Sequence, residues 1–220
     1  MIARQLLTDG ILPLKTSDTG RTALSWMEDL RVMHLPIVNN EGLLGLVSEF
    51  DIYALNNFDE ALGNHQLSLI RPYVNESQHI YDVMRLMHAN QLTIIPVVDG
   101  HENYLGCITL QSLLEYFAEA FSMHEPGAVL VLEMSENDFV LSEIARLAEA
   151  NDTKILSHFV KAFADTTRIE VTLKFNRLNI NGLIQTFLRY NYNIVTAYNE
   201  QNDNDDLRDR FDALMNYLNI

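Results

Sequence analysis

The apolar residues in the first half of the chain follow a pattern that occurs twice. In each copy, apolar side chains at helical spacing precede a short apolar strand, a polar turn and a second strand. A further helix is predicted to begin directly after the second strand, at Ser48 in one copy and at Thr109 in the other. The predicted elements are helices within 23–30 and 80–87, first strands within 36–38 and 93–98, and second strands within 43–47 and 104–108.

The residues themselves repeat along with this pattern. The segment HLPIV at 34–38 recurs as IIPVV at 94–98, and GLVSEFD at 45–51 recurs as GCITLQS at 106–112. The offset changes from sixty to sixty-one between these pairs, so the second copy has one extra residue in its turn. A single unit of this kind leaves an apolar sheet face exposed, whereas two units packed together can bury it.

The second half of the chain is predicted to run strand, helix, strand, strand, helix, strand. This βαββαβ order is typical of a ferredoxin-like fold. After residue 201 the chain is acidic, and its apolar residues lie at helical spacing, so we expect a last helix that packs on the body or on a second subunit. The predicted strands are 127–134, 154–163, 168–175 and 192–198, and the helices are 139–150 and 180–190.

Charge and composition narrow the classes of partner. The chain has a formal net charge of −15, and residues 1–126 contain six Lys and Arg against sixteen Asp and Glu. Nucleic acids and anionic membranes bind basic patches, so neither is an expected partner. No apolar run reaches the ~18 residues of a membrane-spanning helix, and the start of the chain lacks a signal-peptide pattern. Together with a single cysteine, Cys107, these features predict a cytoplasmic protein.

The sequence lacks the patterns that mark common catalytic and metal sites. It contains no His-Glu-x-x-His, Cys-x-x-Cys or Gly-x-Ser-x-Gly, and its seven histidines are scattered. Cys107 falls on a predicted buried strand, where core packing explains it better than a role as nucleophile. We therefore expect a non-catalytic protein with no metal and no resident cofactor.

The two copies resemble a tandem pair of CBS motifs, also called a Bateman module. The motif is an apolar-Pro-apolar strand, a turn, and then Gly-x-x-Ser/Thr-x-x-Asp, as at 34–51. A CBS pair followed by a βαββαβ domain resembles the acetoin-utilisation protein B family. The resemblance implies a mixed α/β and α+β fold, with a CBS pair before a ferredoxin-like, ACT-type domain. The expected domains are 1–125 for the CBS pair, with repeats at about 8–60 and 67–121, then 127–199 for the ACT-like domain and 200–220 for the acidic helix.

The resemblance also implies that an adenosine-containing ligand binds in a cleft between the two motifs. Asp51 takes the position of the carboxylate that accepts both ribose hydroxyls, and Ser48 that of the hydroxyl near the phosphate. His34 lies where a basic phosphate contact is found in several family members. Lys15 and Thr16 lie on the strand edge that frames the adenine.

The second copy departs from the motif. Thr109 is retained, but Ser112 replaces the acid and Ile94 replaces the basic residue. Since a serine cannot bind two hydroxyls as strongly as a carboxylate, we expect a weak or empty second site. For the first copy a simpler interpretation stays open, because Ser48-x-x-Asp51 is also a capping box at the start of a helix.

The scarcity of cations bears on the identity of the ligand. A triphosphate recruits several Lys, Arg or Mg²⁺, so AMP or S-adenosylmethionine is a better candidate than ATP. In the ACT-like domain, Asp138 in the loop at 134–140 either binds an amino acid or caps the next helix. We predict a homodimeric, non-catalytic regulator that senses an adenosine-type ligand and acts on an unidentified protein target. The alternative is a homodimeric structural module with vestigial sites, and a link to acetoin follows from no residue.

Overall fold

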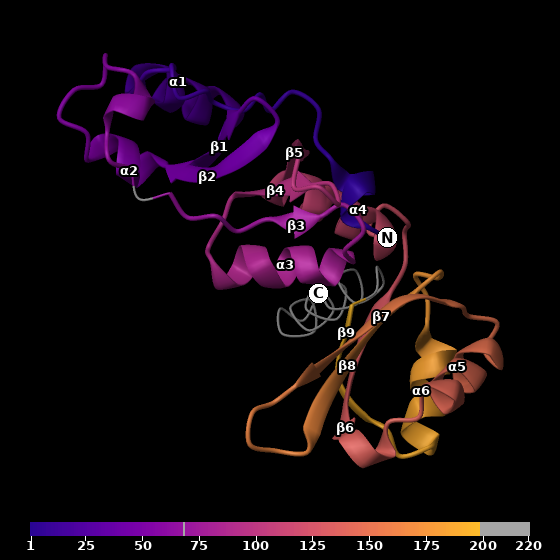
Figure 1. The fold of residues 1–220 in the computed structure, drawn as a ribbon. Coiled ribbons are helices and arrows are strands. Elements are labelled where there is room, and N and C mark those ends of the chain that lie inside the picture. Colours follow the sequence, from indigo (N-terminus) through magenta and orange to yellow (C-terminus); the bar gives the residue numbers. More distant parts are fainter. Residues whose placement is uncertain (68, 199–220) are drawn as a thin grey trace, which may run out of the picture. The chain divides into compact units, whose positions relative to one another are not determined.

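The chain forms two compact units, each built around its own sheets. The computed structural model describes residues 1–67 and 69–198, and the acidic helix predicted at 200–220 lies outside them. The first unit ends at Tyr116, and Figure 1 labels the helices and strands of both units. In the described residues, no helix is both long enough and apolar enough to span a bilayer.

The first unit contains the two predicted copies of one supersecondary unit. After η1 (Ala3–Leu6), its first copy consists of α1 (Gly20–Leu30), β1 (His34–Asn39), β2 (Gly42–Ser48), α2 (Glu49–Tyr53) and η2 (Leu62–Asn64). The second copy consists of β3 (Val74–Asn75), α3 (Ile80–Ala89), β4 (Ile94–Val98), β5 (Tyr104–Thr109) and α4 (Leu110–Ala120), which runs past Tyr116. The helices and paired strands that the apolar pattern predicted are therefore confirmed in both copies.

The two hairpins match each other in register as well as in sequence. His34 pairs with Ser48 at the open end of the β1–β2 hairpin, and Ile94 pairs with Thr109 at the open end of β4–β5. The register shifts by one residue after Ile37 in one hairpin and after Val97 in the other. Because the following helix starts at the open end, each copy places its Gly-x-x-Ser/Thr segment at an equivalent point.

Each copy receives a strand-like segment from the chain that precedes the other copy. Thr8, which precedes the first copy, donates its backbone N–H to the Cys107 carbonyl of β5 at 2.9 Å. Ile70, which precedes the second copy, accepts from the Leu46 N–H of β2 at 2.8 Å. Leu46 and Cys107 are equivalent positions of the repeat, so the exchange is symmetrical.

The two copies share a small apolar seam. Val38 and Leu43 from the first copy pack against Val98 of the second, and Tyr73 and Tyr104 flank them. All three aliphatic residues are buried. Burial of this seam stabilises the pairing that a single copy could not complete by itself.

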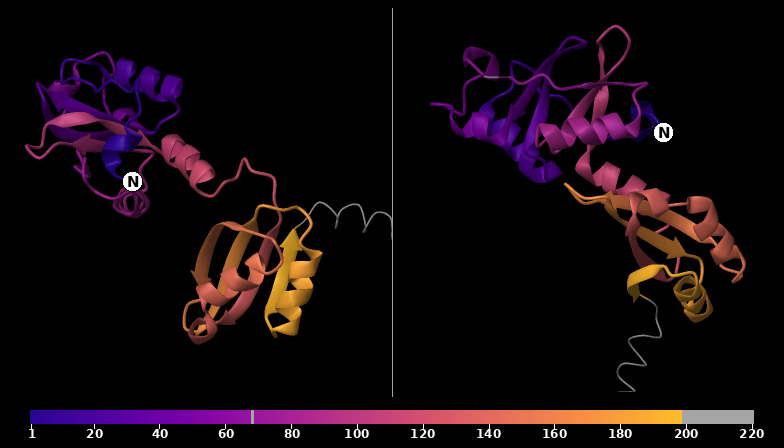
Figure 2. Two further views of the ribbon diagram at one scale, coloured as in Figure 1. Left: turned by 90° about the vertical axis from the view of Figure 1, so that its right-hand side faces the viewer. Right: turned by 90° about the horizontal axis from the view of Figure 1, so that it is seen from below.

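The second unit is a four-stranded antiparallel sheet with both helices on one face (Figure 2). The strand order β7-β8-β6-β9 confirms the predicted ferredoxin-like fold. Its elements are β6 (Val129–Ser135), η3 (Glu136–Asp138), α5 (Leu141–Glu149), β7 (Ile155–Ala162), β8 (Arg168–Phe175), α6 (Asn181–Arg189) and β9 (Asn193–Tyr198).

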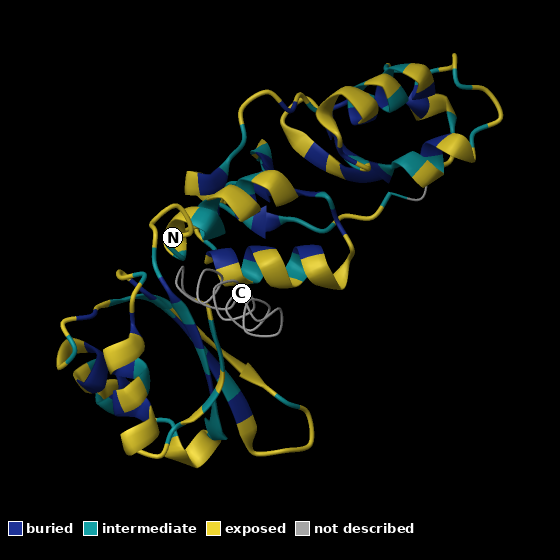
Figure 3. Cartoon of the chain, turned by 180° about the vertical axis from the view of Figure 1, so that it is seen from behind, coloured by how far each residue is buried: buried dark blue, intermediate teal, exposed yellow. Residues whose placement is uncertain are grey.

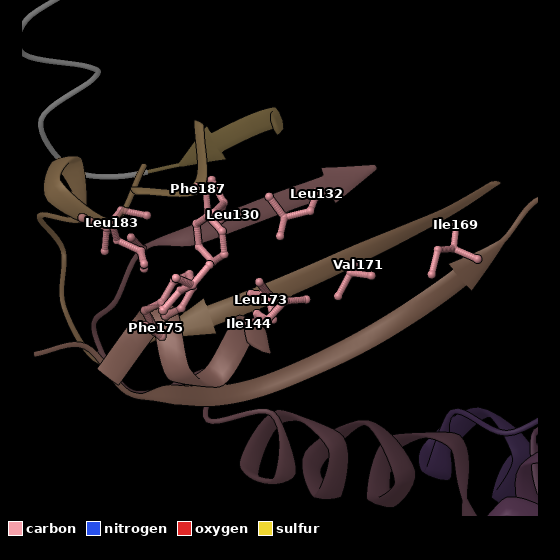
Figure 4. Packing of buried hydrophobic residues seen from close by; sticks show 13 residues of the cluster. Leu130, Leu132, Ile144, Ile169, Val171, Leu173, Phe175, Leu183 and Phe187 are labelled. Atoms are coloured by element: carbon pink, nitrogen blue, oxygen red, sulfur yellow. The ribbon is translucent and has the colours of Figure 1, made fainter. Parts of the chain in front are cut away.

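Alternating side chains place the core of the second unit between its sheet and its helices. Along β8 every second residue is buried, from Ile169 to Phe175, and Leu130 and Leu132 of β6 are buried beside them. Figure 3 shows buried and less buried bands that alternate along the strands of this unit. These side chains meet Ile144, Leu183 and Phe187 of the two helices (Figure 4). A period of two in the strands and a helical stripe in α5 and α6 explain this layer.

Candidate functional site

The open ends of the two hairpins are joined by a polar contact between the copies. The Nδ1 atom of His34 lies 3.1 Å from the Thr93 hydroxyl and 3.4 Å from the Thr93 backbone nitrogen, which donates to it. The Thr93 hydroxyl also accepts the Met33 N–H at 3.0 Å. Thr93 directly precedes β4, so these bonds connect the start of β1 to the start of its counterpart.

Ser48 and Asp51 of the first copy bond to each other. The Asp51 Oδ2 atom accepts from the Ser48 backbone N–H at 2.9 Å and from its hydroxyl at 2.5 Å, and Ser48 Oγ accepts from the Asp51 N–H at 3.1 Å. This is a complete capping box at the start of α2, the arrangement left open by the sequence. Thr109 and Ser112 form the same kind of cap at the start of α4.

A cavity of about 300 Å³ lies at the open end of the second hairpin. Its walls come from residues 8–11 before the first copy, from 30–32 at the end of α1, and from 109–112 at the start of α4, with Thr93 and Glu115 completing it. Both halves of the repeat therefore contribute to it. Its volume falls at the lower end of the range for small-molecule sites.

The sequence model of the CBS domain matches the chain at two places, residues 3–55 and 70–119. These segments hold the two structural copies. Residues 3–119 carry a pair of CBS domains.

Proteins of very different overall length share this CBS pair. The inosine-5′-monophosphate dehydrogenase of Methanocaldococcus jannaschii is 25% identical over 114 residues, which cover 51% of this chain and 23% of that enzyme. The chain therefore spans less than a quarter of the length of this curated relative. Similar solved structures are a CBS domain pair/ACT domain protein from Thermotoga maritima (25% identity, TM-score 0.49, 55% of this chain and 98% of that one) and an AcuB acetoin utilization protein from Vibrio cholerae (23%, 0.49, 57% and 98%).

The charges around the cavity of the CBS pair are mostly negative. Among the residues that line it, Arg31 is the single Lys or Arg, whereas Asp9 and Glu115 are acidic. Arg31 ends α1 in the left-handed conformation, with φ of +54°.

The Thr8 hydroxyl is buried and has no hydrogen-bond partner in the described part of the chain. Such a group is costly unless something completes its hydrogen bonding.

In the CBS pair, the residues predicted to form a ligand site lie in several separate places. Thr109 lines the cavity, while Ser48 and Asp51 lie at the other open end, with His34 opposite Ser48. Lys15 and Thr16 are tied to the loop before α1, where the Lys15 N–H bonds Asp18 and the Thr16 carbonyl accepts from Gly63. Neither of these two lines the cavity.

Sequence reasoning overlooked several cavity residues of the CBS pair. Residues 8–11, Arg31 and Glu115 belong to no part of the repeated motif, yet they form much of the wall. The repeat did contain one usable clue. Each copy is preceded by a short segment that contains no helical pattern. If each of these segments pairs with the hairpin of the other copy, residues 8–11 lie beside the second hairpin.

The second unit has a cavity of its own, of about 520 Å³, at the end of β6. Asp138 lines it together with Glu133, Glu143 and residues 190–193. The expectation that Asp138 caps the next helix is wrong, because Val140 occupies the N-cap position of α5 and Asp138 belongs to η3. The side chain of Val140 cannot accept a hydrogen bond, so this helix begins without a side-chain cap.

The His34 contact predicts a pH-dependent stability of the CBS pair. Burial lowers the pKa of His34, and the nearby negative charge of Asp51 opposes this shift. The unfolded chain therefore binds a proton more readily, so this contribution to stability is lost as the pH falls through the ordinary value of about 6.5. An asparagine in place of His34 would keep an acceptor for Thr93 without titrating.

We expect acidification from pH 8 to 5 to destabilise the wild type more than the His34→Asn variant. Urea unfolding followed by the fluorescence of Trp26, the single tryptophan, measures this in the unit that contains His34. Parallel pH profiles for the two proteins would contradict a folded-state contact of neutral His34.

Proposed function

We propose that the CBS pair binds an adenosine-containing ligand and that the protein is a non-catalytic regulator. The observation that carries this is the cavity at the second hairpin, which both copies build, so the proposal departs from the expectation that this second site is weak or empty. Buried Ile11 and Val32 provide an apolar wall for a base, and the hydroxyl oxygens of Thr93 and Thr109 can accept from a sugar. Mixed walls of this kind are typical of small-molecule sites.

The charges of the cavity favour AMP or S-adenosylmethionine over ATP. One arginine and two carboxylates leave a net negative wall, which repels the roughly four charges of a triphosphate. A single phosphate can pair with Arg31, and the cationic sulfonium of S-adenosylmethionine suits the carboxylates. The site at Ser48 and Asp51 remains a second proposed position for the same class of ligand.

Regulation follows if the ligand prefers one packing of the two copies. The cavity combines the segment before the first copy, the end of α1, and the starts of β4 and α4. A ligand touching all of them shifts the pairing of the copies to the extent that it binds one arrangement better. We propose that a homodimer in the cytoplasm transmits this shift to a protein target.

A specific observation favours the alternative of a structural module with vestigial sites. Both Ser48/Asp51 and Thr109/Ser112 are engaged as helix caps, so each motif has a structural role that needs no ligand. The homodimer would then be the functional form, with no small-molecule response.

Calorimetric titration with AMP, S-adenosylmethionine and ATP tests the proposal. We expect one of the first two ligands to bind once per chain and more tightly than ATP. Loss of a hydrogen bond to the ligand should weaken binding roughly ten- to a hundredfold if it is charge-assisted. Thr109→Val and Asp51→Ala, each titrated well below its own melting temperature because both changes also remove a helix cap, tell whether the second or the first hairpin binds. Absence of binding by all three ligands would favour the structural module.

A further inference from the structure

We infer that Glu115 is the carboxylate that binds the ribose hydroxyls in the cavity of the second hairpin. The inference rests on the proposed adenosine ligand and adds the group that recognises its sugar. Glu115 lies on α4 three residues after Ser112, and both residues line the cavity. Residues three apart on a helix share a face, so Glu115 presents a carboxylate one turn beyond the serine.

Ser112 is unsuited to this task in the structure. Its hydroxyl accepts from the Thr109 N–H at 3.1 Å and donates to the Thr109 carbonyl at 2.9 Å. The hydroxyl proton is thus used within the cap, and the group carries no charge. A ribose in this cavity needs another acceptor for its two hydroxyl protons.

Glu115 is both positioned and available as that acceptor. Its Oε1 atom accepts from the Gln111 side chain at 2.9 Å, which holds the carboxylate against the same stretch of α4. Its Oε2 atom has no hydrogen-bond partner within the described residues. An ionised carboxylate accepts two neighbouring hydroxyls by charge-assisted bonds, which are about twice as strong as neutral ones.

Asp9 is the other carboxylate of the cavity, and its setting is less suited. It precedes Gly10, whose φ of +97° marks a turn outside any helix or strand. Glu115 instead stands on an eleven-residue helix, which fixes its direction of approach. Regular elements hold binding groups more closely in place than loops do.

The test compares adenosine with 2′-deoxyadenosine, the probes that isolate one ribose hydroxyl. For the wild type we expect adenosine to bind at least about tenfold more tightly. Glu115→Gln should lose roughly ten- to a hundredfold in adenosine affinity and bind both nucleosides alike. Glu119→Gln is the matched control, because it removes the same charge from the same exposed helix surface outside the cavity and should change neither affinity.

The outcomes separate this inference from the proposed function. If the wild type binds neither nucleoside nor the three ligands above, both fall. If adenosine binds and Glu115→Gln still discriminates against the deoxynucleoside, the assignment of Glu115 alone is overturned. Loss of discrimination in Asp9→Asn but not in Glu115→Gln would overturn it too, and would assign the sugar to Asp9.

Discussion

Replacing Phe187 with alanine is expected to lower the free energy of unfolding of the second unit by about 3–5 kcal/mol. The Phe187 side chain is fully buried between α6 and the sheet, in the cluster that also contains Phe175 and Leu130 (Figure 4). It meets Tyr192 edge to face, with ring centroids 5.2 Å apart. The change removes both the buried area and this ring contact, and leaves a cavity that a packed sheet cannot close.

A neighbouring residue offers a matched control for this prediction. Leu188 follows Phe187 on α6 but is 49% exposed, so Leu188→Ala should cost less than about 1 kcal/mol. Denaturant unfolding followed by circular dichroism measures both changes. Since whole domains are stable by only about 5–15 kcal/mol, the loss at Phe187 is a large part of the total. Equal costs at the two positions would contradict the structure, in which α6 buries Phe187 and exposes Leu188.

The fold could be predicted from the sequence because its information is local. The period-two pattern of β8 and the helical stripes of α5 and α6 each lie within about ten residues. In the first unit the duplication made the hairpins predictable, because a shared Pro at 36 and 96 and a shared glycine at 45 and 106 align them. Patterns on this scale determine which face of an element is buried.

The candidate site could be predicted only in part, because its walls come from distant residues. Thr8 bonds to Cys107, about a hundred positions later, and Arg31 lines the cavity together with residues about eighty positions later. No local pattern marks either residue. Glu115 was obscured for another reason, since the motif directs attention to Ser112. Ser48 and Asp51 illustrate the reverse problem, because a single spacing serves both a helix cap and a ribose contact.

Replacing Gly45 with alanine is expected to destabilise the first unit by about 3 kcal/mol, and the equivalent Gly106→Ala by distinctly less. A Cβ atom on Gly45 would lie 2.7 Å from the Ile70 carbonyl oxygen and 2.9 Å from Leu69 Cβ. That carbonyl is the acceptor for Leu46, so the segment between the copies cannot retreat without losing its bond to β2. A Cβ on Gly106 would meet only the flexible end of Leu7, at 3.1 Å.

The pair of glycines isolates the cause of this effect. Both have a large positive φ, +157° and +150°, so the conformational cost of alanine is similar at the two positions and cancels in the comparison. The difference in unfolding free energy, followed by Trp26 fluorescence, then reports the close approach of the backbone at Gly45. Equal losses would mean that the exchange of segments at Ile70 is looser than the structure has it. A larger loss at Gly45 would show that the chain between the copies is held firmly against β2, three residues before Ser48.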